Sequence, residues 1–135
     1  MQLATECSLK ATDDAGIEPT MINGISVFSA EKNTEIEVAR NLGIPELTFF
    51  SMIHHGGGAP GGVIQQAAMA VHTGVADYVL VYRAFNERSW HRFGSGVQDR
   101  HQSPEAFDVS FSWSSPFGLL TPASWVAMYA TRYMH

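Results

Sequence analysis

Two apolar segments on either side of a glycine-rich turn constrain the fold of this chain most strongly. The first is LTFFSMI, which leads into HHGGGAPGG, and the second is DYVLVYRAF. Near-continuous apolar runs are typical of strands that are covered on both faces of a parallel sheet. The intervening GVIQQAAMAVHTG has the spacing of an amphipathic helix that ends at Gly74. The helix face that we expect to be buried carries Val63, Ala67, Ala70 and Val71.

The segments before this unit continue the alternation of helices and strands. MQLATECSLKATDDA has helical spacing and is followed by Gly16 as the expected C-cap. INGISVFSA predicts a short strand, and NTEIEVARNLGIP predicts a helix that Asn33 or Thr34 caps and Gly43 closes. This order predicts an α/β fold with a mainly parallel sheet. The expected apolar stripe of the first helix is Leu3, Ala4, Cys7 and Ala11.

The composition is that of a globular chain with few charges to cover a free surface. Of its 135 residues, 45% are hydrophobic and 16% are charged. We interpret the low charge as a sign that some surface is buried against another subunit or domain. The net charge is −5, and nothing resembles the clustered Lys and Arg of a nucleic-acid footprint, so we expect no nucleic-acid partner.

The remaining bulk features predict a cytoplasmic protein. Cys7 is the only cysteine, which excludes an intrachain disulfide framework and indicates a reducing compartment, and we expect it to be a small core residue. No apolar stretch approaches the roughly 20 residues of a membrane span. The N-terminal MQLATECSLK lacks the basic and apolar regions of a secretory signal.

Residues 86–115 change character within what we predict to be one domain, residues 1–135. They are rich in Ser, Gly, Arg, His and aromatic residues and have no long period, so we expect a long loop or an interface. DVSFSW predicts a short strand. TPASWVAMYATRYMH predicts a final helix, with Thr121 as its N-cap and Pro122 in its first turn.

The glycine turn allows two interpretations. Gly56, Gly57 and Gly58, with Gly61 and Gly62, lie where a strand meets a helix start, and their bare amides can bind an anion or a developing oxyanion. Alternatively, the glycines allow two helices or two subunits to pack closely, and spacing alone favours neither interpretation. The spacing matches neither a Walker A motif nor a dinucleotide fingerprint.

Charged and titratable side chains flank this turn. His54 and His55 are candidates for acid/base work, although strand alternation allows at most one of them to face the site, and hydrogen-bonded packing is the alternative role. Two adjacent histidines do not have the spacing that is typical of metal ligands, so we expect no metal. Four of the eight basic residues lie near aromatic residues in one short span, which suits a nucleotide-bearing ligand or a protein interface. A solvated loop with scattered charges explains the same span at least equally well. These four are Arg83, Arg88, Arg92 and Arg100.

Three segments in order match motifs of one known family. Gly74, Ala76 and Asp77 followed by VLV match a G-x-A-D-x-V-L-V motif after an alanine-rich helix. The segments DAG at residues 14–16 and ING at residues 22–24 match an earlier helix end, and TPASWVAMYATRYMH matches a later helix. Together these segments resemble the thiolase superfamily, most closely its lipid-transfer or sterol-carrier branch. The resemblance implies a thiolase-like layered αβαβα fold, of which this chain covers most of the first half.

The sequence departs from that family at the turn. The acyl-accepting cysteine of the family is replaced by Gly57 or Gly58, so thiolysis by a cysteine does not carry over. Loss of the cysteine resembles the steroid-CoA side-chain aldolases, whose retro-aldol acid/base residues are expected in the second half of the fold. We expect a coenzyme A thioester as substrate and no separate cofactor. The alternatives are a non-catalytic lipid-transfer or scaffold subunit and an inactive fragment of a larger enzyme.

The resemblance also implies roles for individual residues. The catalytic candidates are His55, Gly57 and Gly58. The candidates for substrate binding are His54, Gly56, Arg83, Arg88 and Arg92. A homodimer or a partner subunit is expected, and the chain by itself is expected to be inactive.

Overall fold

The computed structural model describes residues 1–29, 31, 33–54, 58–86 and 112–135. These residues belong to two compact units, Met1–Phe85 and Asn86–His135, each of which is described by itself. The division of the chain made from the sequence stays a prediction. None of the described helices is long and apolar enough to cross a membrane.

The first unit is built on a three-stranded parallel sheet. Its strands are β1 (Gly24–Phe28), β2 (Phe49–Ile53) and β3 (Val79–Tyr82), and their spatial order is β2-β1-β3. Both neighbours of β1 run parallel to it, with Gly24 opposite Phe49 on one side and Val79 on the other. The predicted α/β fold with a parallel sheet is confirmed.

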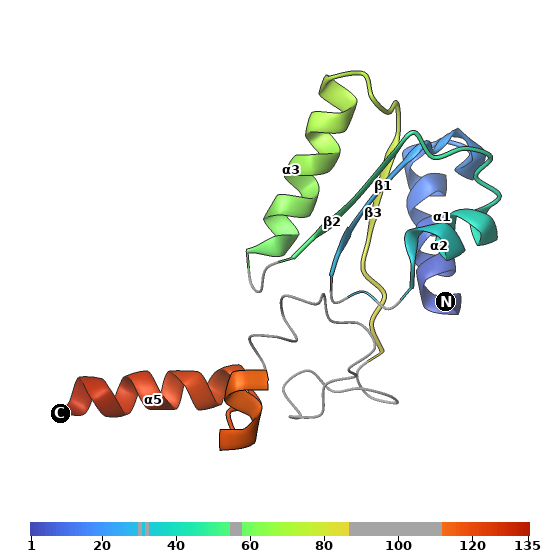
Figure 1. Ribbon diagram of the computed structural model, residues 1–135. Coiled ribbons are helices and arrows are strands. Elements are labelled where there is room, and N and C mark those ends of the chain that lie inside the picture. The colour runs from blue at the N-terminus through green and yellow to red at the C-terminus, as the bar shows by residue number, and fades with distance from the viewer. Residues whose placement is uncertain (30, 32, 55–57, 87–111) are drawn as a thin grey trace. The chain divides into compact units, whose positions relative to one another are not determined.

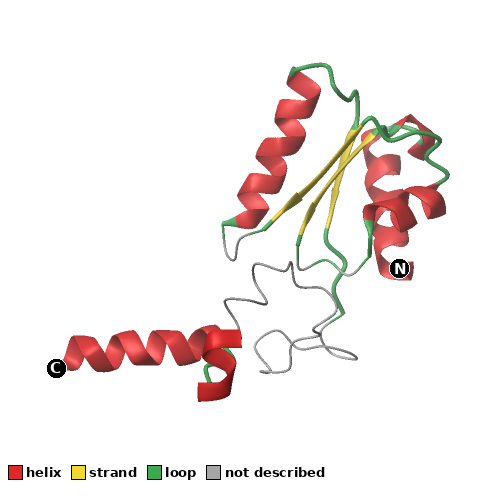
Figure 2. Cartoon of the chain, viewed as in Figure 1, coloured by secondary structure: helices red, strands yellow, loops and turns green. Residues whose placement is uncertain are grey.

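Helices cover both faces of this sheet (Figure 1). Helices α1 (Gln2–Ala15) and α2 (Glu35–Leu42) lie on one side, and α3 (Ala59–His72) lies on the other. A short 3₁₀ helix, η1 (Pro19–Met21), leads from α1 towards β1. Figure 2 shows the same three layers by secondary structure. Parallel neighbours require such crossovers, which explains why helices alternate with strands in the sequence.

Strand alternation decides which residues face each layer. Ile25 and Val27 of β1 pack with Leu80 and Tyr82 of β3 in the main core, which Ala4 of α1 and Val38, Ala39 and Leu42 of α2 complete. The intervening positions face α3, and the Ser26 hydroxyl donates to the Val63 carbonyl oxygen at 3.3 Å. The α3 face is lined by small side chains, so α3 approaches the sheet closely.

The helix ends follow the predicted capping residues. Thr34 caps α2, because its hydroxyl accepts the Glu37 amide while the Glu37 carboxylate accepts the Thr34 amide. Gly43 ends α2 at φ 73°, and Gly16 ends α1 at φ 68°. Both angles lie in the left-handed region that glycine adopts without strain.

The buried face of α1 differs from the predicted stripe. Ala4, Ser8 and Thr12 are buried, whereas Leu3, Cys7 and Ala11 are exposed, so the prediction holds only for Ala4 and the expected core role of Cys7 is wrong. The reason is that α1 packs through short side chains spaced four residues apart, which allow a close approach to α2 and β3. The Thr12 hydroxyl remains satisfied by donating to the Leu9 carbonyl oxygen at 2.9 Å.

Two further predictions of burial are wrong. Val63, Ala67 and Ala70 of α3 are buried as predicted, but Val71 is exposed. The helix begins at Ala59, before the predicted segment, so Ala59 extends the buried stripe by a turn, whereas Val71 lies beside the stripe. Strand β2 is covered on one face only: Phe50 is 67% exposed and Met52 is 45% exposed. The cause is the strand order, since β2 is an edge strand and α1 and α2 pack over β1 and β3.

The second unit contains the predicted final helix. Helix α5 (Pro122–Met134) begins after Thr121, whose hydroxyl accepts the Ser124 amide, and Pro122 lies in the first turn as predicted. A 3₁₀ helix, η3 (Ser115–Phe117), precedes it. Residues 108–111 of the predicted DVSFSW strand lie outside the described residues, and residues 112–113 are helical.

A cluster of hydrogen bonds ties together the amino ends of the strands. The Asn23 Oδ1 atom accepts the Asp77 amide at 2.8 Å, and Asn23 Nδ2 donates to the Asp77 carboxylate at 2.9 Å. The Thr48 hydroxyl donates to the carbonyl oxygens of Asn23, at 3.1 Å, and Val75, at 2.8 Å. Asn23, Gly24 and Asp77 belong to the segments that match the thiolase motifs, and here their function is to join the strand starts.

We expect Gly24→Ala to lower the free energy of unfolding by about 1–3 kcal/mol, because overpacking strains a tight site. A Cβ atom at Gly24 would lie 2.8 Å from Val79 Cγ2 and 3.1 Å from Ala76 Cβ. Gly61→Ala is the matched control, since its Cβ would meet no atom within 4 Å and alanine favours a helix. Urea unfolding of both variants is the measurement. A Gly24→Ala variant as stable as wild type would contradict this packing.

Candidate functional site

The strand order identifies the sheet edge where a ligand site is expected. After β1 the chain passes to α2 on one face, and after the adjacent β2 it passes to α3 on the opposite face. In open α/β sheets, ligands bind beyond the carboxyl ends of two strands whose connections diverge in this way. Here that point lies between Phe28 and Ile53, where the Ser29 amide donates to the Ile53 carbonyl oxygen at 3.0 Å. The candidate site is therefore the carboxyl edge of the sheet.

The N-terminus of α3 opens onto this edge. Gly58 is the N-cap, no side chain caps the helix, and Pro60 in the first turn has no amide to donate. No hydrogen bond links the amides of Ala59 and Gly61 to any residue that the structure describes. Amides at a helix start that no side chain caps can attract an anion, because the helix dipole places partial positive charge there.

The glycines of this region are not equivalent. At Gly62 a Cβ would lie 3.3 Å from Ile53 Cγ2, so this glycine serves the close packing of α3 on β2. At Gly58 and Gly61 a Cβ would meet no atom of the described residues within 4 Å. Packing therefore explains Gly62, whereas no contact with the described part of the chain requires glycine at the other two positions.

Of the residues predicted for the site, three lie in the described part of the chain. His54 directly follows β2, Gly58 caps α3 and Arg83 directly follows β3, so all three lie at the carboxyl edge and all are exposed. The placements of the remaining candidates stay predictions. These candidates are His55, Gly56, Gly57, Arg88 and Arg92, which lie outside the described residues.

Arg83 is held by aromatic rings. Its Cζ atom lies 5.6 Å from the ring centre of Phe28 and 5.9 Å from that of Phe85. Phe28 ends β1, so Arg83 extends across the carboxyl end of the neighbouring strand. Among the described residues no carboxylate pairs with this guanidinium. Its N–H groups are thus available to an anion while the rings stabilise the cation.

A network of polar groups, here called the polar clasp, joins the ends of β1 and β3. It consists of Glu31, Asn33, Tyr82 and Ala84. Glu31 Oε1 accepts the backbone amide of Asn33 at 3.1 Å and Asn33 Nδ2 at 2.6 Å, and Glu31 Oε2 accepts the Ala84 amide at 2.6 Å. Asn33 Nδ2 also donates to the Ala84 carbonyl oxygen at 3.2 Å, and the Tyr82 hydroxyl donates to the Asn33 carbonyl oxygen at 2.6 Å.

Sequence reasoning missed the polar clasp. Its acidic and amide members come from the segment AEKN, which carries no periodic signal, and its tyrosine occupies a strand position that looks purely apolar. The available signal was a buried-strand tyrosine, whose hydroxyl requires a partner inside the fold.

The polar clasp changes the acidity of Tyr82. Burial raises the pKa of its hydroxyl well above the ordinary range, and the charges of Glu31, Glu35 and Glu37 raise it further. The hydroxyl therefore stays protonated and continues to donate to Asn33. Because the folded-state pKa lies above the unfolded value of 10.0, this stabilisation is complete below pH 10 and is lost as the pH rises further.

We expect Tyr82→Phe to lower the free energy of unfolding by about 1 kcal/mol at neutral pH, the usual net value of a hydrogen bond. The difference from wild type should shrink as the pH rises above 10, because only wild type then loses the hydroxyl's contribution. Urea unfolding of both proteins, from neutral pH to above pH 10, measures this difference in the free energy of unfolding. Tyr133→Phe is the control, since Tyr133 is 92% exposed. A difference that grows with pH would contradict the assignment.

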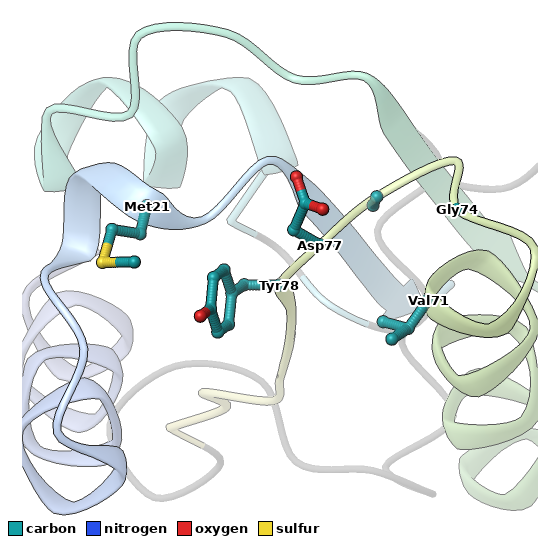
Figure 3. Close-up of a pocket in the computed structure, with 6 residues that line it drawn as sticks. Met21, Val71, Gly74, Asp77 and Tyr78 are labelled. Carbon is teal, nitrogen blue, oxygen red and sulfur yellow. The ribbon is translucent and has the colours of Figure 1, made fainter.

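The opposite edge of the sheet carries an open depression (Figure 3). Met21 and Tyr78 lie on one side of it, Val71 and Gly74 lie on the other, and Asp77 lies between. The Asp77 carboxylate and amide are both engaged with Asn23. The depression lies at the amino ends of β1 and β3, away from Arg83 and the α3 N-terminus. It is therefore not the candidate site.

Metal chemistry has no support in the described residues. Among them no group of three or more His, Cys, Asp or Glu side chains is arranged to hold an ion. The site defined here is instead a set of backbone amides, a histidine and a ring-held arginine at one sheet edge. Such donors suit an anion or a developing oxyanion.

Comparison with known proteins finds that the chain is similar to steroid side-chain-cleaving aldolases. It is 54% identical over 135 residues to the steroid side-chain-cleaving aldolase of Thermomonospora curvata, covering 34% of that protein. It is also 54% identical over 135 residues to the 17-hydroxy-3-oxo-4-pregnene-20-carboxyl-CoA lyase of Mycobacterium tuberculosis, covering 35% of it.

A solved structure agrees with these relatives. The Ltp2-ChsH2(DUF35) aldolase superposes with a TM-score of 0.78 at 53% sequence identity, over 99% of this chain and 32% of the solved one. The chain thus spans about a third of the length of the relatives that it matches. No protein-family model matches the chain. The predicted membership of the thiolase superfamily stays a prediction.

Proposed function

We propose that this protein takes part in retro-aldol cleavage of a steroid-like β-hydroxy acyl-CoA. The observation that carries the proposal is the 54% identity, over all 135 residues, to two enzymes whose names state steroid side-chain cleavage and CoA-lyase activity. The absence of a cysteine from the glycine turn supports it, because retro-aldol cleavage requires no acyl-enzyme. The thiolase-like layered fold belongs to the same proposal.

The reaction defines what the site must stabilise. A base removes the proton of the β-hydroxyl group, the bond between the carbinol carbon and the carbon next to the thioester carbonyl breaks, and a ketone forms. The electron pair of that bond passes into the thioester as an enolate, which then takes up a proton. The negative charge on the thioester oxygen is therefore the charge that hydrogen-bond donors must stabilise.

The N-terminus of α3 is the proposed position of that oxygen. No side chain accepts a hydrogen bond from the amides of Ala59 and Gly61, and no described atom would crowd a Cβ at Gly58. Gly57 and Gly58 would contribute to the same cradle, and the missing cysteine side chain leaves room for a bulky acyl group. Loss of one such donor costs about 3 kcal/mol of transition-state stabilisation in other enzymes.

The remaining candidates are proposed to bind the substrate. His55 is proposed as the polar group nearest the reacting atoms, with His54 and Gly56 beside it. Arg83, Arg88 and Arg92 are proposed to meet the phosphate groups of coenzyme A, since guanidinium groups bind phosphate through paired hydrogen bonds. Support for Arg83 comes from its ring contacts and its place at the carboxyl edge.

A partner subunit or a second copy is proposed to complete the site. The exposed apolar side chains of Phe50 and Met52 on β2 support a covered surface, because monomers rarely expose such groups together. The two-part name of the solved relative, Ltp2-ChsH2(DUF35), supports a partner of a different sequence. We propose that the chain by itself binds the thioester without cleaving it.

The proposal is tested by exchanging the matching segment of a relative. We expect a chimera of the Thermomonospora curvata aldolase, carrying this chain in place of its matching 135 residues, to cleave the substrate of that enzyme. Mass spectrometry of the ketone and acyl-CoA products measures cleavage. A folded chimera without cleavage would contradict the proposal.

Two arginine variants of the chimera sharpen the test. Arg83→Ala should raise KM about tenfold with little change in kcat, because it removes a charge-assisted contact to a part of the substrate that does not react. Arg40→Ala removes the same charge from the exposed end of α2 and should change neither value. Equal effects of the two variants would show that only net charge matters.

A further inference from the structure

The polar clasp fixes the backbone on both sides of Arg83. Glu31 Oε2 accepts the Ala84 amide, directly after Arg83, and the hydroxyl of Tyr82, directly before it, donates to the Asn33 carbonyl oxygen, each at 2.6 Å. On the β1 side the Glu31 amide donates to the Phe28 carbonyl oxygen at 2.8 Å. Glu31 therefore joins the residue whose ring contacts Arg83 to the residue that follows Arg83.

A carboxylate suits this position for a chemical reason. Ionised Glu31 offers only acceptors, and three donors bind it: the amides of Asn33 and Ala84 and the Asn33 side-chain nitrogen. Glu31 is only 7% exposed, so water cannot replace these hydrogen bonds, and losing one leaves a buried polar group unpaired at a cost in free energy. Glutamine has nearly the same shape but would present an NH₂ group to at least one donor.

The consequence lies in the geometry of Arg83. Strand parity places Arg83 and Phe28 on the sheet face that α3 covers, because Ser26, two residues before Phe28, bonds to α3. Arg83 and the open N-terminus of α3 are thus on the same face of the same edge. A flexible exposed arginine would lose side-chain entropy on binding an anion, and prior placement by rings and backbone reduces that loss.

We propose that Glu31 is a positioning residue, which holds the guanidinium of Arg83 over Phe28 so that it meets a phosphate group of the acyl-CoA. This inference rests on the proposed function, since coenzyme A supplies the phosphate. Glu31 itself contacts no substrate. It acts by fixing the exit of β3 against the exit of β1.

Nuclear magnetic resonance of the 135-residue chain, with coenzyme A as the probe, tests the proposal. In wild type the ring currents of Phe28 and Phe85 should change the chemical shift of Arg83 Nε–H, an effect called here the ring displacement. The same signal should shift again when coenzyme A is added. In Glu31→Gln the ring displacement should be lost, and the Kd for coenzyme A should rise about tenfold. Glu46→Gln is the matched control: it removes the same charge from an exposed position before β2 and should change neither quantity.

Several outcomes would overturn the proposal. A Glu31→Gln variant that keeps both the ring displacement and the affinity shows that Glu31 does not position Arg83. Loss of the displacement with unchanged affinity shows that the positioning serves no phosphate. Absence of binding to wild type overturns the ligand role and counts against the proposed function, while the Arg83 signal in the two proteins still decides whether Glu31 holds the side chain.

A second variant applies if Glu31→Gln does not fold. Arg83→Lys changes an exposed side chain, keeps the charge and loses the planar group that stacks on rings. It should weaken binding of coenzyme A by a similar factor at unchanged thermal stability. Unchanged affinity in Arg83→Lys would overturn the proposal.

Discussion

The structure depends on β1 pairing with a parallel strand on each side. Central placement of β1 requires the chain to leave β2, pass over the sheet with α3 and return on the far side as β3. The two crossovers then lie on opposite faces, and the connections that follow β1 and β2 diverge. That divergence creates the opening at the carboxyl edge, along which the α3 N-terminus, His54 and Arg83 lie. The candidate site is thus a consequence of strand order.

Two sets of hydrogen bonds maintain this pairing, one at each end of β1. At the amino end, Asn23 bonds the backbone and carboxylate of Asp77, and Gly24 allows Val79 to approach closely. At the carboxyl end, the polar clasp ties the residues after β1 to those after β3. The amino-end bonds fix register, whereas the carboxyl-end bonds also determine where functional side chains stand. Motif matching found the first set because Asn23 and Asp77 belong to recognisable segments, and missed the second.

The limits of sequence reasoning are visible in particular elements. Strand and helix positions, the Thr34 cap and the parallel sheet were predictable, because periodicity and capping are local signals. The buried faces of α1 and the exposure of β2 were not, because they depend on which element packs on which, and the single cysteine was misplaced for that reason. At the site, Arg83 was found by composition, but its ring partner Phe28 lies 55 residues away in sequence, and no local pattern links them.

The central claim is that the carboxyl edge, and not the depression at the amino edge, receives the acyl-CoA. Mapping amide chemical shifts of the 135-residue chain during titration with a steroid β-hydroxy acyl-CoA tests it most directly. The account predicts that the largest shifts occur at Phe28, Ser29, His54, Arg83 and the first turn of α3. Shifts concentrated instead at Met21, Val71, Asp77 and Tyr78 would contradict it.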